Sequence, residues 1–183
     1  MFPASGTKIK FQDLFTIVGL GGQLEKIRVE NFGIPLKFLK QIILQAEQEY
    51  PRECCGLLFG PAQHRHEYSR FWPCRNAQDE YHARDPQSFP RTSRTAYFIN
   101  PKELLSLQKD ARSRQEEIRI IYHSHIDAPP IFSEEDARVA VLEGEPAYPG
   151  VAYLILSVRA GKATEMKLYR WDGEGNHYAL LEK

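Results

Sequence analysis

The chain has 183 residues, of which 42% are hydrophobic, and it carries 24 basic and 24 acidic side chains. This length and composition suit one domain with a full core, and the balanced charge gives no basic field of the kind that binds nucleic acid. No apolar stretch reaches membrane-spanning length, residues 1–6 do not begin a signal peptide, and three cysteines do not make a secreted disulfide framework. We therefore expect a cytoplasmic protein without a nucleic-acid or membrane partner.

The first third of the chain predicts an extension, a helix and two strands. Residues 1–33 mix glycines with short apolar pieces and form an extension of uncertain order, in which Gly21-Gly22 is best explained as a linker. Apolar side chains then recur every three or four residues from Ile34 to Tyr50, which predicts an amphipathic helix. A buried strand at 53–59 and a second strand near 67–73 follow.

The middle of the chain predicts a loop, a helix and a strand. Residues 77–95 hold charges and prolines with little periodicity, so we expect a long loop, and we hypothesise that it grips a protein substrate. Asn100-Pro101 begins a helix that runs to about Gln115. Residues 118–122 are apolar and rich in β-branched side chains, and they predict a strand.

The last third of the chain predicts one more helix and two more strands. Ser133 is a good N-cap for a helix, because three acidic side chains follow it in the first turn. Strands near 151–158 and 164–171 complete the domain, and residues 173–183 are expected to trail off it as a tail. Helices and strands interleave, which predicts an α/β domain with a mixed sheet flanked by helices.

Two histidines and an aspartate predict a metal site. His123 and His125 stand at positions i and i+2 of an extended segment, so their imidazoles point to the same side. Asp136 follows a short loop and can bring a carboxylate to the same point. Two imidazoles and a carboxylate, with water in the fourth position, are typical ligands of a catalytic zinc. Taken alone, a His-x-His pair is more often structural and Ser133-x-x-Asp136 is more often a helix cap, so the combination carries the prediction.

Glu53 supplies the group that would move protons. It opens the buried strand at 53–59, and a carboxylate at that place can act as a general base and then pass the proton to a leaving amine. On local sequence alone, a solvated acid at a strand end is the better explanation of Glu53, so its role depends on the other site residues. Cys54 and Cys55 alternate across the same strand, so we expect one of them to face the core. Neither cysteine has an identifiable base partner, which argues against a catalytic thiol.

These residues together resemble a known motif. Glu53, His123-Ser124-His125, a seven-residue gap and Ser133-x-x-Asp136 resemble the JAMM motif of the MPN-plus metallopeptidases, and most closely the prokaryotic JAB domains. The likeness runs from about Ile34 to Trp171. It includes the strand that begins at Pro51-Arg52-Glu53, and it extends to Pro73-x-Arg75-Asn76, Ile99-Asn100-Pro101-x-Glu103 and the stretch from Tyr148-Pro149-Gly150 to Val158.

The resemblance implies a fold and a role for each site residue. The fold would be a single JAB/MPN domain over residues 34–172, layered like a cytidine deaminase. His123, His125 and Asp136 would bind one Zn²⁺ per chain with a water as fourth ligand, Glu53 would deprotonate that water, and Ser133 would stabilise the tetrahedral intermediate. Many relatives have proline directly after the second histidine and directly before the serine. Here these positions are Ile126 and Phe132, a departure that affects the rigidity of the loop rather than ligation.

The resemblance also implies an activity. The chain would be a zinc metallopeptidase or isopeptidase that hydrolyses the bond after the C-terminal Gly-Gly tail of a sulfur-carrier or ubiquitin-like protein, in processing or deconjugation. The alternative is a non-catalytic MPN scaffold, against which the presence of all five site residues argues. A zinc deaminase would need His-x-Glu and Pro-Cys-x-x-Cys, which the sequence lacks. The sequence does not define the oligomeric state or the choice between peptide and isopeptide bonds.

Overall fold

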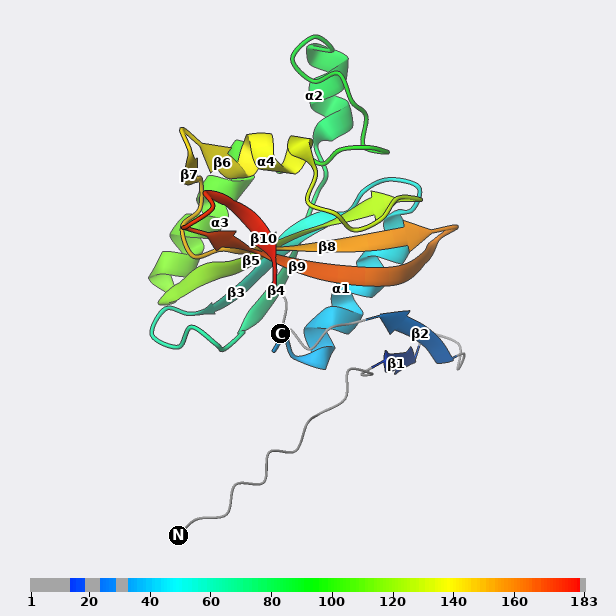
Figure 1. Cartoon of the computed structure of the whole chain (residues 1–183). Coiled ribbons are helices and arrows are strands. Elements are labelled where there is room, and N and C mark those ends of the chain that lie inside the picture. Colours follow the sequence, from blue (N-terminus) through cyan, green and yellow to red (C-terminus); the bar gives the residue numbers. More distant parts are fainter. Residues whose placement is uncertain (1–13, 19–23, 29–32, 182–183) are drawn as a thin grey trace.

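One mixed sheet of eight strands organises the part of the chain that the computed structural model describes, namely residues 14–18, 24–28 and 33–181 (Figure 1). Seven strands follow the order β1-β2-β9-β8-β5-β3-β4, and β10 pairs with β9. Parallel pairing joins β5 to β8 and β2 to β9, and the other pairs in the sheet are antiparallel. The strands are β1 (Leu14–Val18), β2 (Leu24–Arg28), β3 (Cys55–Pro61), β4 (Arg70–Cys74), β5 (Glu116–Ile126), β8 (Ala152–Arg159), β9 (Lys162–Asp172) and β10 (His177–Leu180).

Helices cover both faces of this sheet. The four helices of the described residues are α1 (Leu36–Glu49), α2 (Gln78–Arg84), α3 (Pro101–Ser113) and α4 (Glu134–Ala140). A small separate ladder, β6 (Val141–Leu142) with β7 (Glu145–Pro146), follows α4. One hydrophobic cluster lies between α1 and the sheet, and a second lies between the sheet and α3 and α4. The predicted mixed sheet with flanking helices is confirmed.

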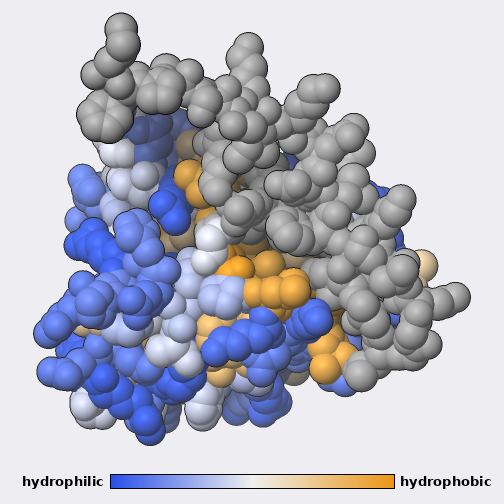
Figure 2. All heavy atoms as spheres, turned by 90° about the horizontal axis from the view of Figure 1, so that it is seen from below, coloured by the Kyte–Doolittle hydropathy of each residue, from blue (hydrophilic) through white to orange (hydrophobic). Residues whose placement is uncertain are grey.

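The helix α1 shows why the sequence folds in this way. Its side chains Phe38, Leu39, Ile42, Ile43 and Ala46 are buried, and this three-and-four spacing is the one that predicted the helix. Figure 2, which views the molecule from below, shows hydrophobic side chains near the middle of the view and hydrophilic ones mainly toward its left and lower edges.

The strand β3 corrects the expectation that only one of two adjacent cysteines faces a core. Cys54 belongs to the cluster under α1, and Cys55 belongs to the cluster on the opposite face. Both side chains are fully buried because both faces of the sheet are covered by helices. All three cysteines of the chain are free thiols.

The segment 77–95 is not the plain loop that its composition suggested. It contains the seven-residue helix α2, whose first turn holds Asp79 and Glu80 and whose last turn holds Arg84. Arg84 and Glu80 form an i,i+4 ion pair at 2.6 Å. A helix of two turns shows too little periodicity to be recognised from sequence.

The C-terminal segment also differs from expectation. Residues 173–183 were expected to trail off, yet 177–180 form β10 and pair antiparallel with β9. Tyr178 is buried there, and its ring lies 4.9 Å from the rings of Phe132 and Tyr153. Within residues 1–33, the short strands β1 and β2 belong to the sheet, whereas the Gly21-Gly22 linker lies outside the described residues.

We expect Tyr178 to stabilise the domain through this aromatic packing. Tyr178→Ala should lower the free energy of unfolding by about 2–4 kcal/mol and Tm by roughly 5–10 °C. Tyr178→Phe is the matched control, because the hydroxyl is buried without a hydrogen-bond partner among residues 33–181 and its loss should cost little. Thermal unfolding of the three proteins tests this. Equal Tm values for Tyr178→Ala and the wild type would contradict it.

Candidate metal centre

The strand β5 brings two histidines to the middle of the sheet. His123 pairs with Cys55 of β3 on one side and with Ile155 of β8 on the other, and its side chain is fully buried. His125 lies two residues further along and is partly exposed. The two Nε2 atoms are 3.1 Å apart, so the prediction that both imidazoles point to one side is confirmed.

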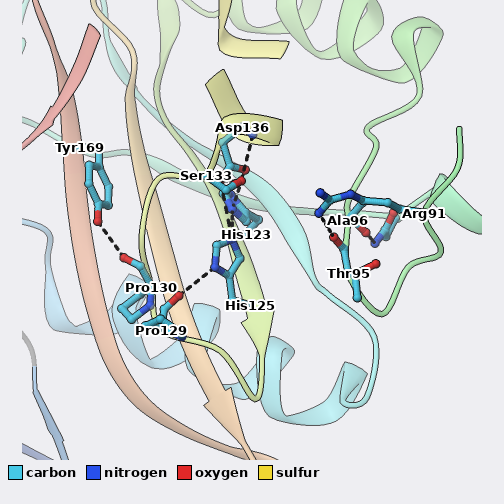
Figure 3. Close-up of polar contacts among 11 residues, drawn as sticks. Arg91, Thr95, Ala96, His123, His125, Pro129, Pro130, Ser133, Asp136 and Tyr169 are labelled. Carbon is cyan, nitrogen blue, oxygen red and sulfur yellow. Dashed lines mark hydrogen bonds and ion pairs between the residues drawn. The ribbon is translucent and has the colours of Figure 1, made fainter. Parts of the chain in front are cut away.

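The N-terminus of α4 brings a carboxylate to the same point (Figure 3). Ser133 is the N-cap, and its backbone N–H and its hydroxyl both donate to Asp136 Oδ2, at 2.8 and 2.6 Å. The Asp136 N–H in turn donates to Ser133 Oγ, which completes a capping box. Asp136 Oδ1 lies 3.0 Å from His123 Nε2. The capping role of Ser133-x-x-Asp136 is therefore confirmed, and it is compatible with the predicted ligand role, because Oδ1 remains directed at His123.

The spacing of these three side chains suits a tetrahedral metal. His123 Nε2 lies 3.0 Å from Asp136 Oδ1 and 3.1 Å from His125 Nε2, and His125 Nε2 lies 3.7 Å from Asp136 Oδ2, the other oxygen of the same carboxylate. Two ligand atoms bound to zinc at about 2.05 Å with a tetrahedral angle lie about 3.3 Å apart. Two imidazole nitrogens and a carboxylate oxygen also match the chemistry of zinc, so the residues fit this ion and could hold it.

A hydrogen bond from the other ring nitrogen of His125 orients its imidazole so that Nε2 faces the candidate metal centre. Its Nδ1 donates to the carbonyl of Pro129 at 3.0 Å, which leaves the lone pair on Nε2, the atom that faces the centre. The same loop is held by the Tyr169 hydroxyl, which donates to the Pro130 carbonyl at 2.9 Å (Figure 3). Ser157 Oγ donates to the Ala128 carbonyl at 2.7 Å.

Phe132 holds this loop against the core by aromatic packing, at a position where many relatives have proline. Its ring packs against the rings of Tyr153, Tyr169 and Tyr178, with centroids 4.9 to 5.5 Å apart. Burial of an aromatic ring restricts the chain much as a proline would, through packing rather than a fixed φ. The residue directly before the helix cap is therefore held in place by the core.

Burial and charge set the protonation states of the three candidate ligands. Burial lowers the pKa of His123, so its ring is neutral and its lone pair is available. Burial alone would raise the pKa of Asp136, but the neighbouring His123, together with hydrogen bonds from both histidines and Ser133, holds it well below the usual range. Burial alone would lower the pKa of His125, and its hydrogen bond to Asp136 and the charge of Glu53 reverse this and raise it.

Glu53 lies beside this group at the start of β3. Glu53 is only 5% exposed, and its pKa is raised to about 8, mainly by burial. The charge of Asp136 adds to this rise, whereas the charges of His125 and Arg91 act to lower the pKa. Its backbone is held on both sides, because its N–H donates to the Ser93 carbonyl at 2.7 Å and its carbonyl accepts from Asn76 Nδ2 at 2.9 Å. The structure thus gathers Glu53 with the histidines and Asp136, although 70 residues separate it from His123 in the chain.

Two residues of the site have supporting roles that motif reasoning did not assign. Asn76 binds the backbone of Glu53 and also accepts from the N–H groups of Gln78 and Phe98, so it joins β3 to the segment after β4. Tyr97 stacks on the His123 ring at 4.4 Å between centroids. Asn76 lies in a stretch that resembled the family, which was a signal, whereas nothing in the sequence marked Tyr97.

The fold and this centre define the class of protein. The chain belongs to the family described as prokaryotic homologues of the JAB domain, which matches residues 35–172. Proteins named CysO-cysteine peptidase from Mycobacterium tuberculosis and Mycobacterium bovis are 24% identical over 147 residues, covering 80% of this chain and 87% of theirs.

Solved structures share the fold. The solution structure of protein DSY2949 from Desulfitobacterium hafniense has a TM-score of 0.54 and 24% identity, covering 80% of this chain and 87% of that one. A protein from Salinibacter ruber has the same TM-score at 22% identity, covering 81% of this chain and 87% of that one.

Among the described residues, no helix has the length and apolar character needed to cross a membrane.

We expect the wild-type protein to bind one Zn²⁺ per chain and Asp136→Ala to bind none at equal metal concentration, because the variant loses an anionic ligand and its cap. His66→Ala is the control, since His66 is exposed and lies in the loop after β3. Zinc content after dialysis is the measurement. Retention of one zinc by Asp136→Ala would contradict the site.

We expect Glu53→Gln to stabilise the metal-free protein at alkaline pH. Burial raises the pKa of Glu53 in the folded protein to about 8, from 4.5 in the unfolded chain, so the stability due to its protonated form is present below about pH 4.5 and is lost as the pH rises through 8. Glutamine does not ionise and avoids this loss. At pH 8–9 the variant should be more stable by on the order of 1–3 kcal/mol, and at pH 4.5 the two proteins should be alike. Parallel stability curves in chelator-treated samples would contradict this.

Proposed function

We propose that this chain is a zinc-dependent metallopeptidase or isopeptidase that hydrolyses the bond after the C-terminal Gly-Gly tail of a sulfur-carrier or ubiquitin-like protein in the cytoplasm. The observation that carries the proposal is the convergence of His123, His125 and Asp136 beside the buried Glu53. Membership of the JAB-domain family and relatives named as peptidases support hydrolysis. The name of those relatives favours a sulfur carrier over a ubiquitin-like modifier.

In this proposal His123, His125 and Asp136 hold the zinc ion. When bound, zinc supplies a Lewis acid that polarises the scissile carbonyl and lowers the pKa of water at the centre. The Ser133 cap binds Asp136 Oδ2, and Oδ1 faces His123, while His125 Nε2 lies 3.7 Å from Oδ2. The carbonyl of Pro129 keeps His125 in the tautomer that a metal requires.

Glu53 is the proton carrier of the proposed reaction. It takes one proton from the attacking water, whose oxygen bonds to the carbonyl carbon of the terminal glycine. It then passes that proton to the nitrogen as the C–N bond breaks. The second proton of the water leaves the new carboxyl group and is taken up by the amine, so the products are the carboxylate of the Gly-Gly tail and a protonated amine. The buried position of Glu53 suits this role, because burial raises the pKa of its carboxyl group and so makes the carboxylate a stronger base than one in water.

Ser133 is proposed to stabilise the tetrahedral intermediate as well. Its single hydroxyl proton is donated to Asp136 Oδ2 in this structure. Donation to an oxyanion therefore requires the hydroxyl to rotate, while the Ser133 backbone N–H keeps its bond to Asp136. The segment 77–95 is proposed to grip the substrate protein, and its Arg91 is close enough to influence the charge of Glu53.

We expect cleavage by the wild type and its loss in Glu53→Gln. A panel of sulfur-carrier and ubiquitin-like fusions, linked after Gly-Gly by a peptide or a lysine isopeptide bond, serves as substrate. Glu53→Gln should lower kcat at least about 100-fold with zinc retained, because proton transfer is lost and ligation is not. Glu134→Gln, an exposed acid at the start of α4, is the control with unchanged activity. Full activity of Glu53→Gln would contradict the role of Glu53 as proton carrier. A wild type that cleaves no fusion and binds no zinc would contradict the proposal as a whole and favour a scaffold.

A further inference from the structure

The three candidate ligands differ in what holds them from behind. The Asp136 carboxylate is held by Ser133, and the His125 ring donates from Nδ1 to the carbonyl of Pro129. The Nδ1 atom of His123 is buried and has no hydrogen-bond partner among the described residues. A histidine that binds a metal almost always gives this second nitrogen to an acceptor, which orients the ring. Within this part of the chain, the most buried of the three ligands is therefore the one without that support.

The ring of a histidine turns easily unless a neighbour holds it. Its χ2 torsion joins an sp³ carbon to an sp² carbon, so the torsion has no sharp staggered minima. With Nε2 facing the centre as an acceptor, the neutral ring of His123 carries its proton on Nδ1. An N–H that no described group accepts gives the plane of the ring no preferred direction. Another contact has to fix that plane if Nε2 is to stay 3.0 Å from Asp136 Oδ1 and 3.1 Å from His125 Nε2.

The ring of Tyr97 lies against the flat side of the His123 ring. The two centroids are 4.4 Å apart and the planes are inclined by 21°, which is a stacked arrangement. The rings of His123 and His125 meet differently, with centroids 5.0 Å apart and planes tilted by 48°. A ring in nearly parallel contact restricts rotation about χ2, because turning the imidazole would drive its edge into the tyrosine. The stack thus sets the plane of the His123 ring, and Asp136 and His125 face the edge that carries Nε2.

The backbone on both sides of Tyr97 is held in place by one side chain. The carbonyl of Ala96 accepts from Asn76 Nδ2 at 3.1 Å, and the N–H of Phe98 donates to Asn76 Oδ1 at 3.1 Å. The same Asn76 amide donates to the carbonyl of Glu53 at 2.9 Å. Tyr97 and the proposed proton carrier are therefore fixed to the same anchor, which makes the tyrosine ring a rigid support rather than a mobile one.

We propose that Tyr97 is a positioning residue that fixes the plane of the His123 ring by stacking, in place of the kind of hydrogen bond that orients His125. This inference rests on the zinc site of the proposed function. Stacking is a property of the ring and not of the hydroxyl, so position 97 requires an aromatic side chain. Without the stack the metal has to order the imidazole itself, and this loss of conformational freedom on binding weakens the affinity.

The zinc affinity of the full chain tests the inference, measured by competition with a chelating indicator. Tyr97→Phe keeps the ring and should bind zinc like the wild type. Tyr97→Leu and Tyr97→Met, which place non-aromatic side chains in the same space, should each bind zinc at least about 10-fold more weakly. The visible spectrum of bound Co²⁺ should divide the variants in the same way, because it reports the geometry of the ligands.

Phe98→Leu separates this role from general packing. The Phe98 ring packs against the rings of Tyr81 and Phe89, with centroids 4.6 and 5.2 Å away. This variant removes an aromatic ring one residue further along the same segment, so it should lower Tm as Tyr97→Leu does and keep the zinc affinity.

The possible results separate the inference from the proposed function. Wild-type zinc affinity in Tyr97→Leu and Tyr97→Met, or an equal loss of affinity in Phe98→Leu, would overturn the inference alone. A loss of affinity in Tyr97→Phe as large as in Tyr97→Leu would also overturn it, because the hydroxyl and not the ring would then be the support. A wild type that binds no zinc would overturn the proposed function and the inference with it.

Discussion

Asp136 divides its carboxylate between two tasks, and the rest of the candidate centre depends on this division. Oδ2 receives the N–H and the hydroxyl of Ser133, while Oδ1 faces His123. A single cap therefore begins α4 and orients the anionic side chain of the proposed ligand set, so the direction of the carboxylate is fixed by helix formation itself. Without that cap the buried carboxylate would face two histidines in an undefined rotamer.

Hydrogen bonds and aromatic packing hold the loop between β5 and α4 in one conformation. The loop between β5 and α4 gives three carbonyls, at Ala128, Pro129 and Pro130, to donors from the sheet and from His125. Phe132 closes the loop by packing into an aromatic cluster that includes Tyr178 of β10. The C-terminal strand thus contributes to the geometry of a site that lies more than 40 residues earlier in the chain. Rigid support of this kind is what a metal centre requires.

The sequence was informative where the site is local and uninformative where it is not. His123 and His125 lie on one strand, and Ser133 and Asp136 lie on one helical turn, so period and capping rules predicted both pairs. Glu53 meets them only because β3 pairs with β5, with Cys55 opposite His123, and no local pattern encodes that register. The resemblance to a family supplied this link instead.

The elements that sequence reasoning missed share a physical cause. Helix α2 has only two turns, and β10 is a four-residue strand whose place depends on β9. Features that arise from tertiary contact between distant segments are invisible to short-range rules. The supporting roles of Asn76 and Tyr97 belong to the same class.

The central claim is that two histidines and one aspartate form a zinc site, and X-ray absorption at the zinc edge tests it most directly. For the zinc-loaded wild type, the account predicts a four-coordinate ion with two imidazole nitrogens and two oxygens at about 2.0–2.1 Å. Sulfur scattering at about 2.3 Å would instead place the metal at the buried cysteines and contradict the account. Six-coordinate zinc with oxygen ligands alone would contradict it as well.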